Sequence, residues 1–155
     1  MIHYRNDVRG SGVDGRALVA TARRLLDALG ERGASLSLRL VGDRAIRAIN
    51  REHRGKDAAT DVLSFSLREP NEDSAQRPVA ERLLGDVVIS VETARRQADG
   101  YDASLQDELY RLLIHGLLHV MGHDHEAAAQ RRVMEREERR LAAAIGLRWP
   151  YEAAG

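Results

Sequence analysis

Alternating and continuous runs of apolar residues mark the expected β-strands of this chain. Across Ser35–Val41 leucine occupies every second position, so Leu36, Leu38 and Leu40 share one face of a strand. The segment Gly85–Ser90 has a continuous apolar centre, which is typical of a strand that is covered on both faces and lies inside its sheet. Two further strands are expected at Ile2–Arg5 and Asp61–Leu67.

Apolar residues at helical spacing, bounded by capping residues, predict the helices between these strands. Asp14 is a suitable N-cap for a helix that reaches about Leu29, with Gly30 just beyond its end. Ser104, with the acidic Asp107 three residues later, begins a leucine-rich helix. The other helices are expected to begin at Asp43 and to span Glu92–Ala98 and Glu126–Ile145. This order of elements predicts an α+β fold with α/β character, in which a single domain contains a small, mixed, four-stranded sheet packed with helices.

Two segments are polar enough to be assigned to the surface. Residues 68–79 contain two prolines and no apolar periodicity, so we expect an exposed loop there. Residues 131–140 alternate in charge, which predicts a solvated helix face with ion pairs between residues four apart.

The composition is that of a soluble domain. Of the 155 residues, 43% are hydrophobic and 31% are charged, which is ordinary for a globular protein. No apolar run approaches the roughly 20 residues of a membrane helix, and the amino terminus lacks the apolar core of a secretion signal. The absence of cysteine excludes a disulfide-linked partner and thiolate metal ligands. We therefore expect a cytoplasmic protein without a membrane partner.

The stretch His115–His125 contains four of the six histidines of the chain. His115 and His119 are four residues apart, which places their imidazoles on one side of a helix. Gly122 suits the left-handed position that ends a helix, and the turn after it would bring His125 back toward the other two. Three neutral imidazoles with one open coordination position are the ligand set of a catalytic zinc ion. We therefore predict one zinc ion per chain, in a metal-dependent hydrolase domain that comprises residues 1–155.

The residue after the first of these histidines separates the motif from that of peptidases. The spacing matches the metzincin peptidases, in which a glutamate at this position acts as the general base. Here the residue is Gly116, which cannot accept a proton, so a base would have to lie elsewhere. Peptidase activity is therefore the weaker prediction.

Four other residues are candidates for supporting roles at such a site. Asp86 and Asp61 each lie at the start of an expected strand, where they could hydrogen-bond to a ligand imidazole or cap the strand. His123 and Asp124 lie between the ligands and could transfer protons or shape the turn. These alternatives stay open.

Several basic residues precede the strand that is expected to begin at Asp61. The chain as a whole has 24 basic and 24 acidic residues, so it has no net charge that would attract nucleic acid. Arg54 and Lys56 flank Gly55 in an expected loop. Glycine allows close approach of an anion, and arginine suits bidentate contact with phosphate. Arg54 is thus a candidate for stabilising charge on a phosphate in a transition state, with Lys56 close by in the sequence. The neighbouring Arg44, Arg47 and Arg51 are expected on a solvated helix face.

Three segments resemble one known family. His115–His125 (HGLLHVMGHDH) resembles the signature of the YbeY family of bacterial endoribonucleases, also called rRNA maturation factors. Residues 50–65 (NREHRGKDAATDVLSF) resemble that family's segment around its active-site arginine, and residues 84–90 (LGDVVIS) resemble its next strand. The departures are His53 and His123, where tyrosine is common in relatives, and Ala59, where proline is common.

The resemblance implies both a site and a cellular role. His115, His119 and His125 would bind zinc, and Arg54 would be the cationic residue in the cleft beside the metal. With RNA as the substrate, Lys56 is a candidate RNA contact. The protein would be a single-strand-specific endoribonuclease that acts in rRNA processing, especially at the 3′ end of the small-subunit RNA, and in ribosome quality control. The expected partners are single-stranded RNA, rRNA, the small ribosomal subunit and assembly factors.

Other functions and mechanisms stay open at this point. One alternative is a non-catalytic ribosome-assembly factor in which zinc only fastens the turn from Gly122 to His125. Another is a metallopeptidase. The residues do not separate attack by hydroxide from attack by the adjacent ribose 2′-OH, and they do not identify the general base. Nickel, cobalt and copper also accept three imidazoles, so zinc is the favoured ion among several.

Overall fold

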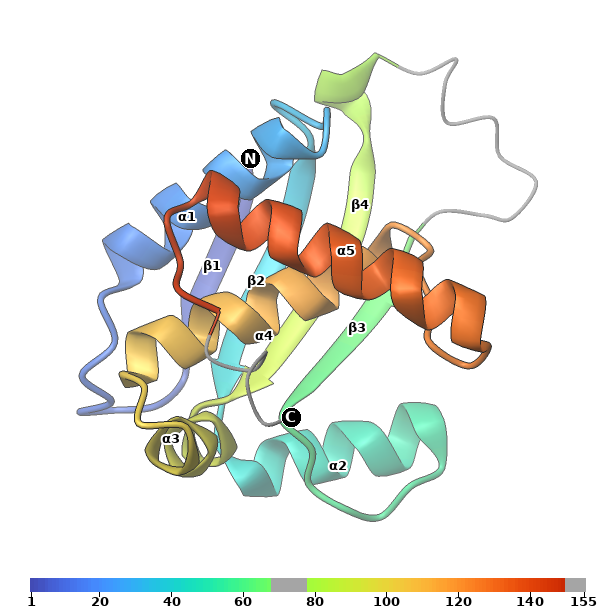
Figure 1. Cartoon of the computed structure of the whole chain (residues 1–155). Helices are drawn as coiled ribbons and strands as arrows, with labels where there is room; N and C mark the ends of the chain where they lie inside the picture. Colours follow the sequence, from blue (N-terminus) through green and yellow to red (C-terminus); the bar gives the residue numbers. More distant parts are fainter. Residues whose placement is uncertain (68–77, 150–155) are drawn as a thin grey trace.

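In a computed structural model, which describes residues 1–67 and 78–149, the chain forms one mixed four-stranded sheet (Figure 1). The strands are β1 (Ile2–Asn6), β2 (Ser35–Val41), β3 (Val62–Ser66) and β4 (Leu83–Ser90), in the order β1-β2-β4-β3. The pairs β1–β2 and β2–β4 are parallel, whereas β3 runs antiparallel to β4. The predicted mixed four-stranded sheet is confirmed, as is the internal position of the strand at 85–90.

The helices that accompany the strands include two that begin at the predicted capping residues, Asp14 and Ser104. The helices are α1 (Gly15–Ala28), α2 (Asp43–Arg54), α3 (Val91–Gly100), α4 (Leu105–Val120) and α5 (Ala128–Ala144), with a short 3-10 helix η2 (Val79–Glu81) before β4. The Asp14 carboxylate accepts the Ala17 N–H at 3.0 Å, and the Ser104 hydroxyl accepts the Asp107 N–H at 3.0 Å. None of the helices in residues 1–67 and 78–149 is long and apolar enough to cross a membrane.

Three predicted boundaries need correction. Arg54 is the last residue of α2 rather than part of a loop, because the helix continues until Gly55 adopts a left-handed conformation (φ 71°). Strand β4 begins at Leu83, which pairs with Ser35, so Asp86 lies inside the strand instead of at its start. Of the loop expected at 68–79, residues 68–77 lie outside the described part of the chain, and Val79 begins η2.

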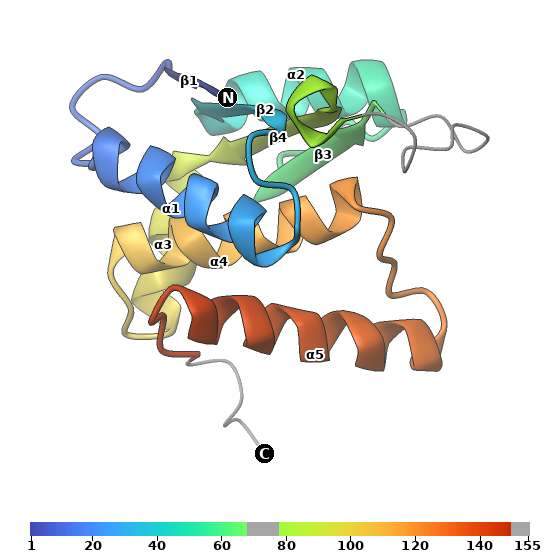
Figure 2. The same ribbon diagram turned by 90° about the horizontal axis from the view of Figure 1, so that it is seen from above.

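The sheet is covered on both faces. Helix α2 lies on one face, α1 and α4 lie on the other, and α5 packs outside α1 and α4 (Figure 2). The larger core lies between the sheet, α1, α4 and α5, and it includes the predicted buried leucines 36, 38 and 40 of β2. A smaller core beneath α2 is formed by Val41, Ile46, Leu63 and Val88.

Gly116 allows α4 to lie close against the sheet. The residue is buried within the helix, and a Cβ atom there would lie 2.9 Å from Val87 Cγ1 and 3.2 Å from Val62 Cγ2. Both valines are β-branched residues of strands, so neither methyl group can easily rotate away. A side chain at position 116 would therefore point into the sheet rather than toward solvent.

We expect the variant Gly116→Ala to lower the free energy of unfolding by about 1 kcal/mol, because overpacking costs roughly 1–3 kcal/mol and the better helix propensity of alanine recovers about 1 kcal/mol. Urea denaturation followed by circular dichroism would measure the change. Gly100→Ala is the matched control, because a Cβ atom there at the end of α3 would meet nothing within 4 Å. Equal stability of Gly116→Ala and wild type would contradict the close packing of α4 on β3 and β4.

Candidate metal centre

The end of α4 turns the chain back as the position of Gly122 predicts. Gly122 has a φ of 98°, and its N–H donates to the carbonyl of His119 at 3.0 Å. The N–H of His123 donates to the carbonyl of Leu118 at 2.9 Å. These two bonds form a Schellman motif, which satisfies the last carbonyls of the helix and fixes the direction of the residues that follow.

This turn brings three histidine side chains to one point. His115, His119 and His125 each contribute a ring nitrogen, and these atoms all lie within 4.8 Å of one another. The Nε2 atoms of His115 and His119 are 3.2 Å apart. Two nitrogens bound to a tetrahedral zinc ion at about 2.0–2.1 Å would lie about 3.4 Å apart, so the donor set fits such an ion. The predicted convergence of the three imidazoles is confirmed.

The electrostatic environment favours the neutral form of the His119 imidazole. Burial lowers the pKa of His119 below its usual value, and the nearby His115 and His125 lower this pKa further. A hydrogen bond to the backbone of His123 and the charge of Asp124 act in the opposite direction but do not outweigh them. The net effect suits metal binding, because a histidine coordinates an ion through an unprotonated nitrogen.

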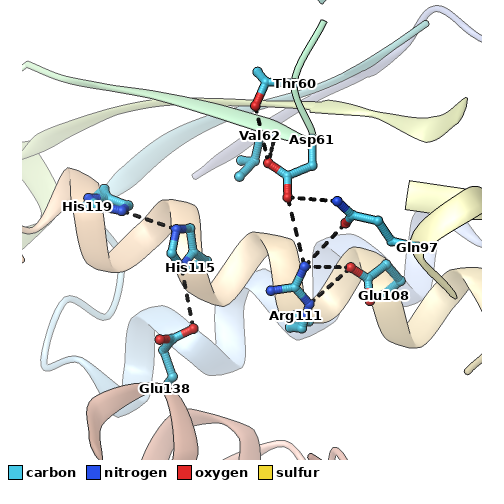
Figure 3. Close-up of polar contacts among 9 residues, drawn as sticks. All are labelled: Thr60, Asp61, Val62, Gln97, Glu108, Arg111, His115, His119 and Glu138. Atoms are coloured by element: carbon cyan, nitrogen blue, oxygen red, sulfur yellow. Dashed lines mark hydrogen bonds and ion pairs between the residues drawn. The ribbon is translucent and has the colours of Figure 1, made fainter. Parts of the chain in front are cut away.

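A carboxylate from α5 contacts one of the three histidines. Glu138 Oε2 lies 3.4 Å from His115 Nδ1, and Glu138 is only 9% exposed (Figure 3). The sequence predicted a solvated face for residues 131–140 and missed this contact. The sequence does contain an indication of this burial. Glu138 lies at helical spacing from the apolar residues Met134 and Leu141, which are both buried in the larger core. The prediction of a fully solvated face is therefore wrong at Glu138.

Asp61 lies beside α4, but its carboxylate contacts residues other than the three histidines. Its carboxylate accepts the Val62 N–H at 2.7 Å and the Gln97 side-chain amide at 3.2 Å, and it lies 3.9 Å from Arg111 Nη2 (Figure 3). Arg111 also donates to Glu108 at 2.7 Å. Asp61 therefore joins β3 to α3 and α4 through this network, instead of holding a ligand imidazole.

The remaining supporting candidates have separate places. Asp86 is half-buried within β4, and no hydrogen bond joins it to a ligand imidazole in the described part of the chain. Asp124 accepts the backbone N–H of His125 at 2.7 Å, which shows that it shapes the turn. A proton-transfer role for Asp124 or for the half-buried His123 stays a prediction.

Arg54 is the last residue of α2, the helix that covers the opposite face of the sheet from α4, and Lys56 follows two residues later. Arg54 Nη2 donates to the carbonyl of Ser64 on β3 at 2.5 Å, and its guanidinium carbon lies 5.0 Å from the ring centroid of Phe65. Both side chains are exposed. Arg54 thus contacts the same edge strand that packs against Gly116 of α4, but its role toward a substrate stays a prediction.

The chain is similar to proteins of one family along most of its length. The family model described as endoribonuclease YbeY matches residues 4–146. An endoribonuclease YbeY from Anaeromyxobacter sp. is 54% identical over 132 residues, which are 85% of this chain and 65% of that protein. One from Moorella thermoacetica is 47% identical over 141 residues, which cover 86% of this chain and 90% of its own length.

A solved structure supports the fold independently of close sequence similarity. The solution structure of a protein from Thermotoga maritima matches with a TM-score of 0.58 and covers 99% of this chain and 97% of that one. The two are 22% identical, so this likeness concerns the fold alone. With the family model matched over nearly the whole chain and the three histidines converging at its motif, this chain belongs to the endoribonuclease YbeY family.

Proposed function

We propose that this chain cleaves single-stranded RNA at the three-histidine site, as a metal-dependent endoribonuclease. The observation that carries the proposal is the convergence of His115, His119 and His125 in a chain of the endoribonuclease YbeY family. Three protein ligands leave one position of a tetrahedral ion for a substrate or water, whereas structural zinc sites are closed by a fourth protein ligand. This difference favours catalysis over a purely structural zinc in a ribosome-assembly factor.

Zinc is the proposed ion, at one per chain. The three ligand atoms are all imidazole nitrogens with a neutral form favoured at His119, which suits zinc among the common cellular metals. When bound, zinc would polarise a phosphodiester oxygen and lower the pKa of a water molecule. The helix α4 and the Schellman turn would hold the three histidines in place for the ion, because both belong to a well-packed part of the chain.

Arg54 is the proposed phosphate-binding residue. Within residues 1–67 and 78–149, its contacts are a backbone carbonyl and an aromatic ring, and no carboxylate neutralises its charge. The guanidinium fork can exchange the single Ser64 carbonyl for two oxygens of a scissile phosphate, because charge-assisted bidentate bonds are the stronger ones. Lys56, two residues beyond α2, would contact a neighbouring phosphate.

The position of Gly116 argues against the peptidase alternative. A glutamate there would be directed at Val87 and Val62 of the sheet, where it could not reach a substrate beside the three histidines. The protein's general base is therefore supplied by another residue, by a water molecule or by the RNA itself.

The cellular substrate proposed for this chain is ribosomal RNA. By resemblance to the family, the reaction serves maturation of the small-subunit RNA at its 3′ end and ribosome quality control, in the cytoplasm and with the small ribosomal subunit and assembly factors as partners. Aromatic residues make up only 4% of the chain, so stacking on bases contributes little over a long strand. Recognition then rests on the phosphate backbone, on shape and on the ribosomal partners.

Metal removal tests this function directly. Protein loaded with zinc should cut a labelled single-stranded RNA and spare the matching duplex, and chelation should abolish cleavage until zinc is restored. The product ends distinguish the routes, because a 2′,3′-cyclic phosphate excludes direct attack by hydroxide. Bound zinc without cleavage of free RNA or of RNA in ribosomal particles would overturn the proposal in favour of a non-catalytic assembly factor.

A further inference from the structure

We infer that Glu138 is a positioning residue of the metal centre, which holds the His115 imidazole in the tautomer and orientation that leave Nε2 free for the ion. This inference rests on the metal-dependent function proposed above. It concerns a residue of α5 that lies 23 positions beyond His115 and outside the histidine motif.

The two nitrogens of His115 face different partners. Nδ1 lies 3.4 Å from Glu138 Oε2, and Nε2 lies 3.2 Å from His119 Nε2 (Figure 3). With a proton on Nδ1 donated to the carboxylate, the lone pair of Nε2 is directed at the point where the three imidazoles meet. Histidines that bind metals commonly donate their second N–H to a carboxylate or carbonyl, which fixes the ring and raises its basicity.

His115 needs such a partner from another element more than His119 does. His115 lies within α4, where the nearby backbone carbonyls are bonded in the helix. The imidazole of His119, by contrast, has a hydrogen bond to the backbone of His123 in the turn. The carboxylate that α5 places beside α4 supplies the missing support at His115.

The burial of Glu138 fits this role better than a purely structural one. Its side chain is 12% exposed and shares the buried face of α5 with Met134 and Leu141. Within the described part of the chain, the Glu138 carboxylate has His115 as its partner. The preceding residue, Glu137, instead pairs with Arg140 at 2.7 Å. Burial of a carboxylate is costly, and a divalent ion bound by the three imidazoles would lie close enough to offset part of that cost.

Glu138 is placed neither as a fourth ligand nor as a general base. The converging group consists of the three histidines, and Glu138 is not among the side chains whose ligand atoms meet within 4.8 Å. Its oxygen lies against Nδ1, on the far side of the His115 ring from Nε2. A carboxylate in that place acts on the ion through the imidazole rather than by contact.

The test is the zinc affinity of Glu138→Gln, measured by competition with a chromophoric chelator. We expect the dissociation constant to rise by about 10- to 100-fold, since the amide keeps the shape of the side chain but loses the charge. Glu137→Gln is the matched control: it removes a carboxylate from the adjacent position, where the partner is Arg140, and should leave zinc affinity unchanged. Cleavage by Glu138→Gln should recover toward the wild-type rate at saturating zinc.

A second measurement uses the wild-type protein and does not depend on how the variant folds. Nitrogen NMR of histidine in the zinc-loaded protein should show His115 protonated at Nδ1 and metal-bound through Nε2. An unchanged affinity in folded Glu138→Gln, or a proton on Nε2 of His115, would overturn the inference while leaving RNA cleavage intact. If the wild-type protein binds no metal, the proposed function fails together with the inference.

Discussion

His119→Ala should abolish zinc binding and reduce RNA cleavage by at least about a thousandfold, which corresponds to about 4 kcal/mol of transition-state stabilisation. The reason is geometric: His119 is the middle ligand, with its ring centroid 4.7 Å from that of His115 and 5.1 Å from that of His125. Without it the remaining two imidazoles cannot complete the three-ligand set of a catalytic zinc site. Metal content by mass spectrometry and cleavage of labelled single-stranded RNA would measure both effects.

The fold of the His119→Ala protein should persist, because the larger core is formed by other, apolar side chains of α4. Circular dichroism and the unfolding midpoint without metal should therefore match those of the wild type. His3→Ala is a suitable control, since His3 is an exposed residue of β1 outside the converging group. Retained cleavage in a metal-free His119→Ala protein would exclude the three-histidine site as the catalytic centre.

Arg54→Ala should reduce cleavage by about 100- to 1,000-fold, the range seen when one group that stabilises transition-state charge is removed. Zinc content should stay at the wild-type level, because Arg54 contacts Ser64 and Phe65 on β3 and none of the histidines. Stability should also change little, since the side chain is exposed. Single-turnover cleavage rates with metal analysis of the same samples would separate the two roles.

Two variants sharpen the test of Arg54. Arg54→Lys keeps the charge but loses the planar fork, so it should recover only part of the lost rate if the phosphate contact is bidentate. Arg44→Ala removes an exposed arginine from the first turns of the same helix and should have a much smaller effect. Simultaneous loss of zinc and activity in Arg54→Ala would contradict the division between metal binding and phosphate binding.

The features that sequence reasoning predicted correctly are those determined by near neighbours. The alternation of Leu36, Leu38 and Leu40 predicts their burial because a strand places every second side chain on one face. The caps at Asp14 and Ser104 and the left-handed Gly122 each depend on three to five consecutive residues. The convergence of the three histidines could be predicted for the same reason, since one helix end and one turn contain all three of them.

The features it missed depend on contacts between distant segments. Glu138 reaches His115 only because α5 folds back along α4, and the many charges of α5 obscure its narrow apolar stripe. Asp61 lies close to Arg111, which is fifty residues later in the chain, and not to an imidazole. The sequence around Gly55 is compatible with a helix that ends before Arg54 and with one that ends at Arg54. In the structure Gly55 is the C-cap, so Arg54 belongs to α2 and not to the expected loop.

The short span between His115 and His125 also determines how the ion and the fold influence each other. Gathering ligands only four and six residues apart costs little loop-closure entropy, so an unfolded chain can bind the same ion through the same histidines. Binding to the unfolded state subtracts from the stabilisation that the ion gives to the native state. A bound metal would therefore stabilise the native state only by the difference between its affinities for the folded and the unfolded chain.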